Sequence, residues 1–168
     1  MACGPKYFTY INQELPTLCR RFFGIQPVPE RTYIMGLSMG GYGAMKCAFT
    51  APQQYAGCAG FSSVAEIQAE LPQLCRWHED QAIFPHGIVP PQDDLFELVE
   101  KFRDGTCPMP RLFLACGQQD SLYPASLRLR DTLQAMNWPL TWYEAPGDHN
   151  WFFWNDALGR AMKELLEN

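Results

Sequence analysis

Short apolar runs alternate with amphipathic stretches along most of the chain. Four runs of four to six mainly apolar residues predict buried strands, at residues 32–37, 56–61, 111–116 and 140–143. Apolar residues at helical spacing around these runs predict helices at about residues 9–23, 39–51, 124–136 and 151–166. A strand, a helix and a strand of these lengths form a βαβ unit, which makes the sheet parallel. The predicted class is therefore α/β, a mostly parallel sheet flanked by helices.

The pattern loosens between residues 62 and 110, which is more chain than a single crossover helix needs. We expect a helix at 64–74 and a proline-rich loop at 84–92. Asp94 opens a sequence that resembles a capping box and predicts a further helix to about residue 103. We therefore expect one domain over residues 1–168, with a cap or insertion at about 64–106.

Composition and charge narrow the class of protein further. Of the 168 residues 47% are hydrophobic and only 18% are charged, which is typical of a globular domain rather than a disordered chain. A net charge of -5 gives no reason to expect nucleic acid or an anionic membrane as a partner. Seven cysteines without a C-x-x-C pair favour a reducing compartment, and no apolar run approaches a membrane span. We expect a soluble cytoplasmic protein.

A glycine-flanked serine follows the first predicted strand. The run Gly36-Leu37-Ser38-Met39-Gly40 matches G-x-S-x-G, and a strand before it and a helix after it are the context in which this motif presents a nucleophile. The glycines are expected to let the strand and the helix approach closely. The alternative role for Ser38 is that of a helix N-cap without catalytic function, but capping does not require the glycines at 36, 40 and 41. Ser38 is therefore the candidate nucleophile.

A nucleophilic serine needs a histidine to accept its proton and a carboxylate to orient that histidine. Asp120 and His149 each follow a predicted strand, in the chain order Ser, Asp, His that this kind of fold uses. The carboxyl ends of parallel strands lie at the same end of a sheet, so the three side chains are expected to lie together. The alternative role for Asp120 is to shape the turn before Ser121, with no part in catalysis. Asp148 is a rival acid, but a Gly–Asp turn explains it, and we interpret it as structural.

Other histidines and aromatic residues are candidates for weaker roles. His78 and His86 lie in the irregular middle of the chain, where a solvated histidine is the commonest outcome, and His86 is kept as a candidate for substrate binding. Trp151 is the other candidate, although the aromatic run 151–154 is more simply interpreted as a core anchor of the last helix. With three histidines far apart in sequence, neither a metal nor another cofactor is expected.

Four segments together resemble a known family. They are residues 10–16, 36–44, 116–123 and 146–154. In these segments the chain is similar to the esterase D-like, or tributyrin esterase, branch of the α/β-hydrolases, with S-formylglutathione hydrolases and feruloyl and acetyl esterases as relatives. The resemblance runs from about residue 7 to 166 and is weakest between 64 and 109. It implies an α/β-hydrolase fold that hydrolyses small carboxylic esters or thioesters through an acyl-enzyme on Ser38, with His149 as the base and Asp120 as its orienting acid.

The resemblance also implies strands that precede the first strand predicted here. In this fold the oxyanion hole takes one backbone N–H from the residue after the nucleophile, here Met39, and another from a loop after an earlier strand. The chain thus resembles the C-terminal part of a hydrolase, and we expect a weak esterase whose strand 32–37 is a bare edge open to self-association. Two rival functions remain, a silent hydrolase fragment that serves as an interaction module and an acyltransferase that uses the same three residues.

Overall fold

A four-stranded sheet forms the centre of the computed structural model, which describes residues 5–74 and 83–167. The strands are β1 (Tyr33–Leu37), β2 (Gly57–Phe61), β3 (Arg111–Gly117) and β4 (Leu140–Ala145). Their order in the sheet is their order in the chain, and all three pairings are parallel. The predicted parallel α/β class is confirmed, with strand bounds that differ by one or two residues. β1 and β4 are the two edges of this sheet.

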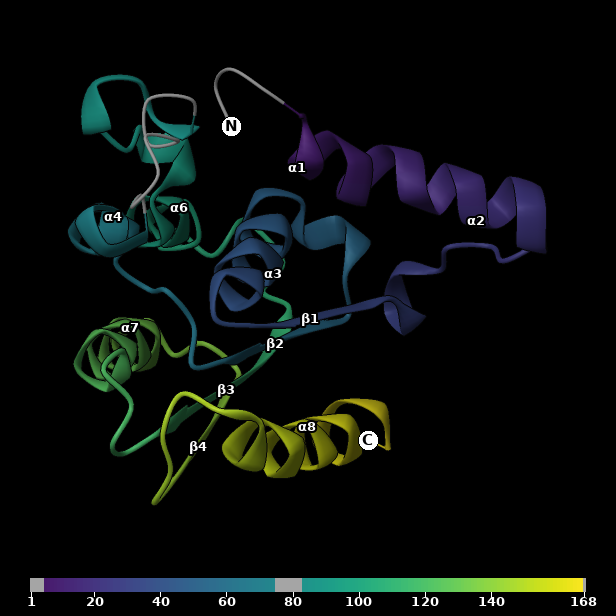
Figure 1. Cartoon of the computed structure of the whole chain (residues 1–168). Coiled ribbons are helices and arrows are strands. Elements are labelled where there is room, and N and C mark those ends of the chain that lie inside the picture. The colour runs from purple at the N-terminus through teal and green to yellow at the C-terminus, as the bar shows by residue number, and fades with distance from the viewer. Residues whose placement is uncertain (1–4, 75–82, 168) are drawn as a thin grey trace.

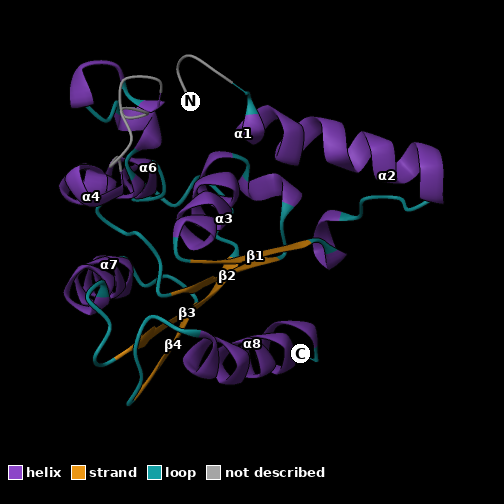
Figure 2. Cartoon of the chain, in the orientation of Figure 1, coloured by secondary structure: helices purple, strands orange, loops and turns teal. Residues whose placement is uncertain are grey.

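Helices cover both faces of the sheet (Figures 1 and 2). The helices on one face are α3 (Met39–Thr50), α6 (Leu95–Glu100) and α7 (Tyr123–Ala135), and α8 (Trp151–Leu166) lies on the other. A hydrophobic core lies on each face of the sheet, and alternate residues of a strand point into one core or the other. Leu112 and Leu114 of β3 pack toward α3, while Phe113 and Ala115 pack toward α8. Because all strands are parallel, the connections that follow them gather at the carboxyl end of the sheet, which is where the candidate site lies.

The N-terminal helix, predicted at 9–23 with Pro16 tolerated only in its first turn or at a kink, has a π-helical stretch. Its parts are α1 (Tyr7–Thr9), η1 (Tyr10–Glu14) and α2 (Leu15–Phe23). Pro16 has no N–H to donate to the carbonyl four residues earlier, and a wider turn just before it accommodates the ring. Gly24, with φ of 67°, ends α2 in the left-handed conformation.

A buried amide attaches this N-terminal helix to α3. The Nδ2 group of Asn12 donates to Cys47 Sγ (3.0 Å), and its Oδ1 accepts from the hydroxyl of Tyr55 (2.8 Å). Asn12 is only 5% exposed, so both ends of its amide are satisfied inside the protein. In contrast, α2 beyond this anchor has no buried residue, and it runs outward past the sheet (Figure 1).

The segment between β2 and β3 contains α4 (Ile67–Leu74) and α6, joined in part by the short 3₁₀ turns η4 (Pro85–Gly87) and η5 (Pro91–Asp93). Both helices are shorter than predicted, but Asp94 does cap α6, because its carboxylate accepts the N–H groups of Phe96 and Glu97. Ile67, Leu95 and Val99 are buried in the same core as α3. Across the described part of the chain, none of the helices has the length and apolar character needed to cross a bilayer.

Candidate active site

Ser38 occupies a sharp turn between β1 and α3. Its φ of 54° and ψ of −123° lie outside the regions that a serine ordinarily adopts. The turn is held by the backbone: the N–H of Ser38 donates to the carbonyl of Phe61 (2.9 Å), and its carbonyl accepts from Gly41 (3.0 Å) and Val64 (3.3 Å). The strained conformation is therefore fixed against the end of β2, as a nucleophile presented for reaction requires.

Glycine is required at two of the three positions that the sequence singles out. A Cβ on Gly36 would lie 2.1 Å from the carbonyl oxygen of Gly40, and a Cβ on Gly41 would lie 2.1 Å from Ser63 Oγ. A Cβ on Gly40 would meet nothing within 4 Å. The expectation that Gly40 also permits a close approach is wrong, because its Cα faces open space rather than the strand.

The structure brings the three predicted residues into one hydrogen-bonded array. His149 Nε2 lies 3.0 Å from Ser38 Oγ, and His149 Nδ1 lies 2.9 Å from Asp120 Oδ2. The Asp120 side chain is fully buried, whereas the His149 side chain is 34% exposed. The second oxygen of Asp120 accepts the N–H of Leu122 (2.9 Å). With Nδ1–H donating to Asp120, Nε2 is left as an acceptor for the serine hydroxyl, which is the arrangement needed for proton transfer.

Reciprocal contacts between two loops set the spacing of Asp120 and His149. The N–H of Gln119 donates to the carbonyl of Gly147 (2.9 Å), and the N–H of Gly147 donates to Gln119 Oε1 (2.6 Å). A Cβ on Gly117 would lie 2.4 Å from the same Gly147 oxygen. Sequence reasoning missed this connection; the only signal for it was a glycine in each of the two turns.

Aromatic rings support the histidine from one side. The ring of Trp154 meets that of His149 edge to face, with centroids 4.9 Å apart, and Trp151 meets Trp154 at 5.4 Å. The interpretation of residues 151–154 as core anchors is right for Phe153 and Trp154, which are buried. It is wrong for Trp151 and Phe152, which are 61% and 92% exposed, because these two lie on the solvent side of the helix.

The remaining predicted residues occupy different places. Met39 is the first residue of α3, so its N–H has no partner within the helix and is available beside Ser38. Trp151 is linked to His149 through Trp154, whereas His86 is exposed, with φ of 64°, in a turn between β2 and β3. Their substrate-binding roles stay predictions, and His78 lies outside the described residues.

Two further observations concern charge at the site. Asp148 Oδ1 accepts the backbone N–H of His149 (2.7 Å), which agrees with its interpretation as a turn residue. Burial raises the pKa of Cys116 to about 11, so this thiol stays neutral on the strand that leads to Asp120. Among residues 5–74 and 83–167, no three His, Cys, Asp or Glu side chains cluster as metal ligands would.

The fold and the site define a class of protein before any relative is considered. A parallel sheet flanked by helices, with a serine on a strained strand-to-helix turn, is the architecture of the α/β-hydrolase serine hydrolases. Solved structures agree. The fluorophosphonate-binding serine hydrolase F of Staphylococcus aureus is 29% identical, with a TM-score of 0.89 over 100% of this chain and 66% of its own. The S-formylglutathione hydrolase FrmB of the same organism is 30% identical, with a TM-score of 0.87 over 98% of this chain and 65% of its own.

Sequence comparison gives the family. The family model "Esterase: Putative esterase" matches residues 2–100, and the chain belongs to this esterase family. An acetyl esterase of Caldicellulosiruptor saccharolyticus is 27% identical over an alignment 168 positions long, which covers 94% of this chain and 63% of the relative. An S-formylglutathione hydrolase of Bos taurus is 35% identical over 72 residues, 43% of this chain and 23% of its own. The chain thus spans less than two thirds of the length of these relatives.

Proposed function

We propose that this chain is a serine esterase that hydrolyses small carboxylic esters or thioesters through an acyl-enzyme on Ser38. The observation that carries the proposal is the hydrogen-bonded sequence from Ser38 through His149 to the buried carboxylate of Asp120. Membership of the esterase family supports the same chemistry. Matched relatives named acetyl esterase and S-formylglutathione hydrolase support small acyl groups on either oxygen or sulfur.

In the first half-reaction, Ser38 Oγ forms a bond to the acyl carbon while His149 Nε2 takes the serine proton. The tetrahedral intermediate then collapses, the bond from carbon to the leaving oxygen or sulfur breaks, and His149 returns the proton to that atom. In the second half-reaction water attacks the acyl-enzyme, again with His149 as the base, and the acid is released from Ser38. Asp120 holds the imidazole in the required tautomer and stabilises its protonated form.

The negative oxygen of the intermediate needs hydrogen-bond donors. The N–H of Met39, at the N-terminus of α3, is the donor that we assign from this chain. In other enzymes the loss of one oxyanion donor costs about 10²–10³ in kcat. We therefore expect turnover to depend strongly on the N–H of Met39.

Labelling with a fluorophosphonate probe tests the proposal. One of the matched S. aureus hydrolases is described as fluorophosphonate-binding. We expect labelling at Ser38 that is lost in Ser38→Ala and strongly reduced in His149→Ala. Asp120→Asn should slow labelling about 10³–10⁴-fold because the tautomer is no longer fixed. Asp148→Asn is the matched control: its side chain still accepts the N–H of His149, so labelling should not change.

Failure of a folded sample to label would refute the esterase and support the silent interaction module. Equal loss in Asp120→Asn and Asp148→Asn would refute the assigned acid. Hydrolysis and acyl transfer share the acyl-enzyme, so they are separated by the products formed from one ester in water with and without a competing alcohol. Acid as the main product in both conditions supports hydrolysis; an ester of the added alcohol as the main product supports the acyltransferase.

A further inference from the structure

Glu144 lies near the end of β4, beside the loop that carries Asp120. This loop, residues 118–122, joins β3 to α7, and we call it the acid loop. Glu144 is in register with Cys116, one residue before β3 ends, and its side chain is 33% exposed. The Glu144 carboxylate is therefore close to the place where the acid loop leaves the sheet.

The carboxylate accepts hydrogen bonds from both ends of the acid loop. Its Oε1 accepts from Gln118 Nε2 (3.3 Å), and its Oε2 accepts from the hydroxyl of Tyr123 (2.9 Å), the residue that follows the loop. Oε2 also accepts the indole N–H of Trp142 (2.7 Å), two residues earlier on β4. Residues two apart on a strand project to the same face, so Trp142 fixes the direction in which the carboxylate points.

A surface ion pair with Arg130 is the simpler explanation for Glu144. Arg130 Nη1 lies 3.8 Å from Glu144 Oε2, whereas its Nη2 lies 2.7 Å from Asp131 Oδ1. The guanidinium thus bonds Asp131 and only borders Glu144. Hydrogen bonds from Trp142 and Tyr123 lower the pKa of Glu144, so neutral donors hold an ionised carboxylate. Hydrogen bonds to an ionised group are roughly twice as strong as those between neutral groups.

Tyr123 passes this restraint to Asp120. The N–H of Tyr123 donates to the carbonyl of Asp120 (3.0 Å), and the N–H of Leu122 donates to Asp120 Oδ1 (2.9 Å). A displacement of Tyr123 would therefore move both the main chain and the carboxylate of Asp120. The contact between Asp120 Oδ2 and His149 Nδ1 (2.9 Å) would change with it.

We propose that Glu144 is a positioning residue, whose single carboxylate holds the two ends of the acid loop together and so fixes Asp120 against His149. This role rests on the proposed function, in which Asp120 orients the histidine. The hydrogen bonds of Glu144 go to Gln118, Tyr123 and Trp142 rather than to the serine or the histidine. Glu144 therefore acts through Asp120 alone.

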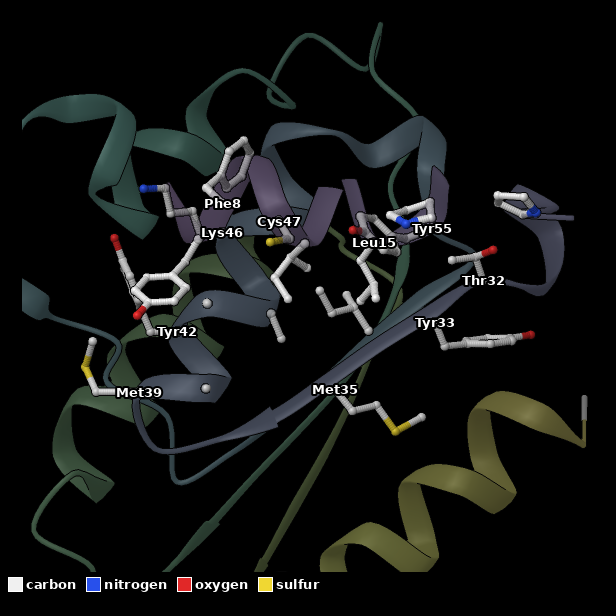
Figure 3. A pocket seen from close by; sticks show the side chains of 18 of the residues that line it. Phe8, Leu15, Thr32, Tyr33, Met35, Met39, Tyr42, Lys46, Cys47 and Tyr55 are labelled. Carbon is white, nitrogen blue, oxygen red and sulfur yellow. The ribbon is translucent and has the colours of Figure 1, made fainter. Parts of the chain in front are cut away.

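The large cavity that reaches the serine turn lies away from this network. Its volume is about 1090 Å³, and it runs along β1 with Met39 at one end (Figure 3). β1 and β4 are opposite edges of the sheet, and the residues that line the cavity do not include Gln118, Tyr123 or Glu144. Substitution of Glu144 should therefore change how the hydrogen-bonded array reacts, and not how a probe in this cavity is bound.

NMR of the histidine ring nitrogens in the full 168-residue chain tests the positioning directly. A neutral ring carries its proton on Nδ1 or on Nε2, and the hydrogen bond at each nitrogen decides which. We expect the Nδ1–H form of His149 in the unsubstituted chain and a mixture with the Nε2–H form in Glu144→Leu. Tyr123→Phe, a milder change that removes only the hydroxyl, should shift the mixture in the same direction. Asp120→Asn gives the signal of a ring without its carboxylate, and the exposed His86 gives that of a solvated ring.

Asp156→Leu is the matched control. The Asp156 carboxylate also accepts from a tyrosine of β4, Tyr143, and from an arginine, Arg160, but these bonds lie on the α8 side of the sheet, away from the acid loop. Its loss should leave the tautomer of His149 unchanged.

Fluorophosphonate labelling measures the consequence for the chemistry. Glu144→Leu should lower the labelling rate at saturating probe about 10–10²-fold, since a small misplacement of a catalytic group has effects of this size. The probe concentration that gives half of the maximal rate should not change. Glu144→Gln should recover most of the rate, because its amide oxygen still accepts from Tyr123. In a Tyr123→Phe background Glu144→Leu should cost less, because both changes remove the same hydrogen bond.

A His149 tautomer that is unchanged in both Glu144→Leu and Tyr123→Phe would overturn the proposal. So would equal effects of Glu144→Leu and Asp156→Leu, or strictly additive losses in the double variant. The NMR measurement needs no catalysis. If the unsubstituted chain does not label, the esterase assignment fails, while the tautomer still decides the role of Glu144.

Discussion

Substitution of Gly36 by alanine tests how tightly the serine turn is packed. The added Cβ would lie 2.1 Å from the carbonyl oxygen of Gly40 and 2.3 Å from its carbonyl carbon, whereas ordinary contacts are 3.4–4 Å. Both atoms belong to the backbone of the first turn of α3, which cannot rotate aside as a side chain can. β1 cannot retreat freely either, because Gly36 is in register with Gly60 of β2. The strand and the helix must therefore separate.

The expected cost follows from the nature of this contact. Overpacking a well-packed site typically costs 1–3 kcal/mol when side chains can adjust, so a clash between backbone atoms should cost about 3 kcal/mol or more. This is a large part of the ~5–15 kcal/mol that stabilises a typical domain. For a chain of this size each kcal/mol corresponds to roughly 2–4 °C, so the midpoint should fall by about 6–12 °C.

Urea and thermal unfolding of Gly36→Ala and Gly43→Ala measure the effect. Gly43 is the matched control, since it lies inside α3 and its added Cβ would meet nothing within 4 Å. That variant should gain about 0.5–1 kcal/mol, as alanine does in a helix interior. Both substitutions reduce the freedom of the unfolded chain equally, so the difference between them reports the clash. If Gly36→Ala unfolds within about 1 kcal/mol of the unsubstituted chain, the close approach described here is wrong.

Three further predictions concern other parts of the structure. Trp154→Phe keeps an aromatic ring against His149 and deletes an indole N–H that has no partner among the described residues. Probe labelling of this variant should therefore fall less than tenfold. Trp154→Leu removes the ring and should lower labelling further. The hydrogen-bonded ion pair with Arg128 lowers the pKa of Glu66. The pair therefore stabilises the fold at pH values above the unfolded pKa of about 4.3. This stabilisation is lost as pH falls through the lower pKa that Glu66 has in the folded protein. Chemical denaturation of Glu66→Gln should show a deficit of at most ~1 kcal/mol at pH 7 that disappears as pH falls through the lowered folded pKa of Glu66; a deficit that persists in stronger acid contradicts this. Cys116 should react with iodoacetamide at pH 8 only after unfolding, as peptide mass spectrometry would show.

The sequence determined the fold class because its signals are local. Each strand is a short apolar run bounded by turn residues, and the residues that follow the strands include a serine, an aspartate and a histidine in the expected order. Parallel pairing then brings these three positions to the carboxyl end of the sheet, so the proximity of Ser38, Asp120 and His149 could be predicted from the sequence.

Features that depend on contacts between distant segments could not be found this way. The bonds between Gln119 and Gly147 join two loops whose proximity exists only in the folded sheet. The edge contact of Trp154 with His149 depends on the phase at which α8 begins, which four consecutive aromatic residues do not decide. That phase also leaves Phe152 in solvent. Pro16 indicated a kink, but the choice of a π-helical turn depends on how the helix is anchored through Asn12.

The free edge of β1 and the array of Ser38, His149 and Asp120 depend on different neighbours. Ser38 is held from the β2 side by Phe61 and Val64, and the spacing of Asp120 and His149 is set between the loops after β3 and β4. None of these contacts lies on the side of β1 that faces away from β2. The array should therefore form in this chain without any contact on the open side of β1.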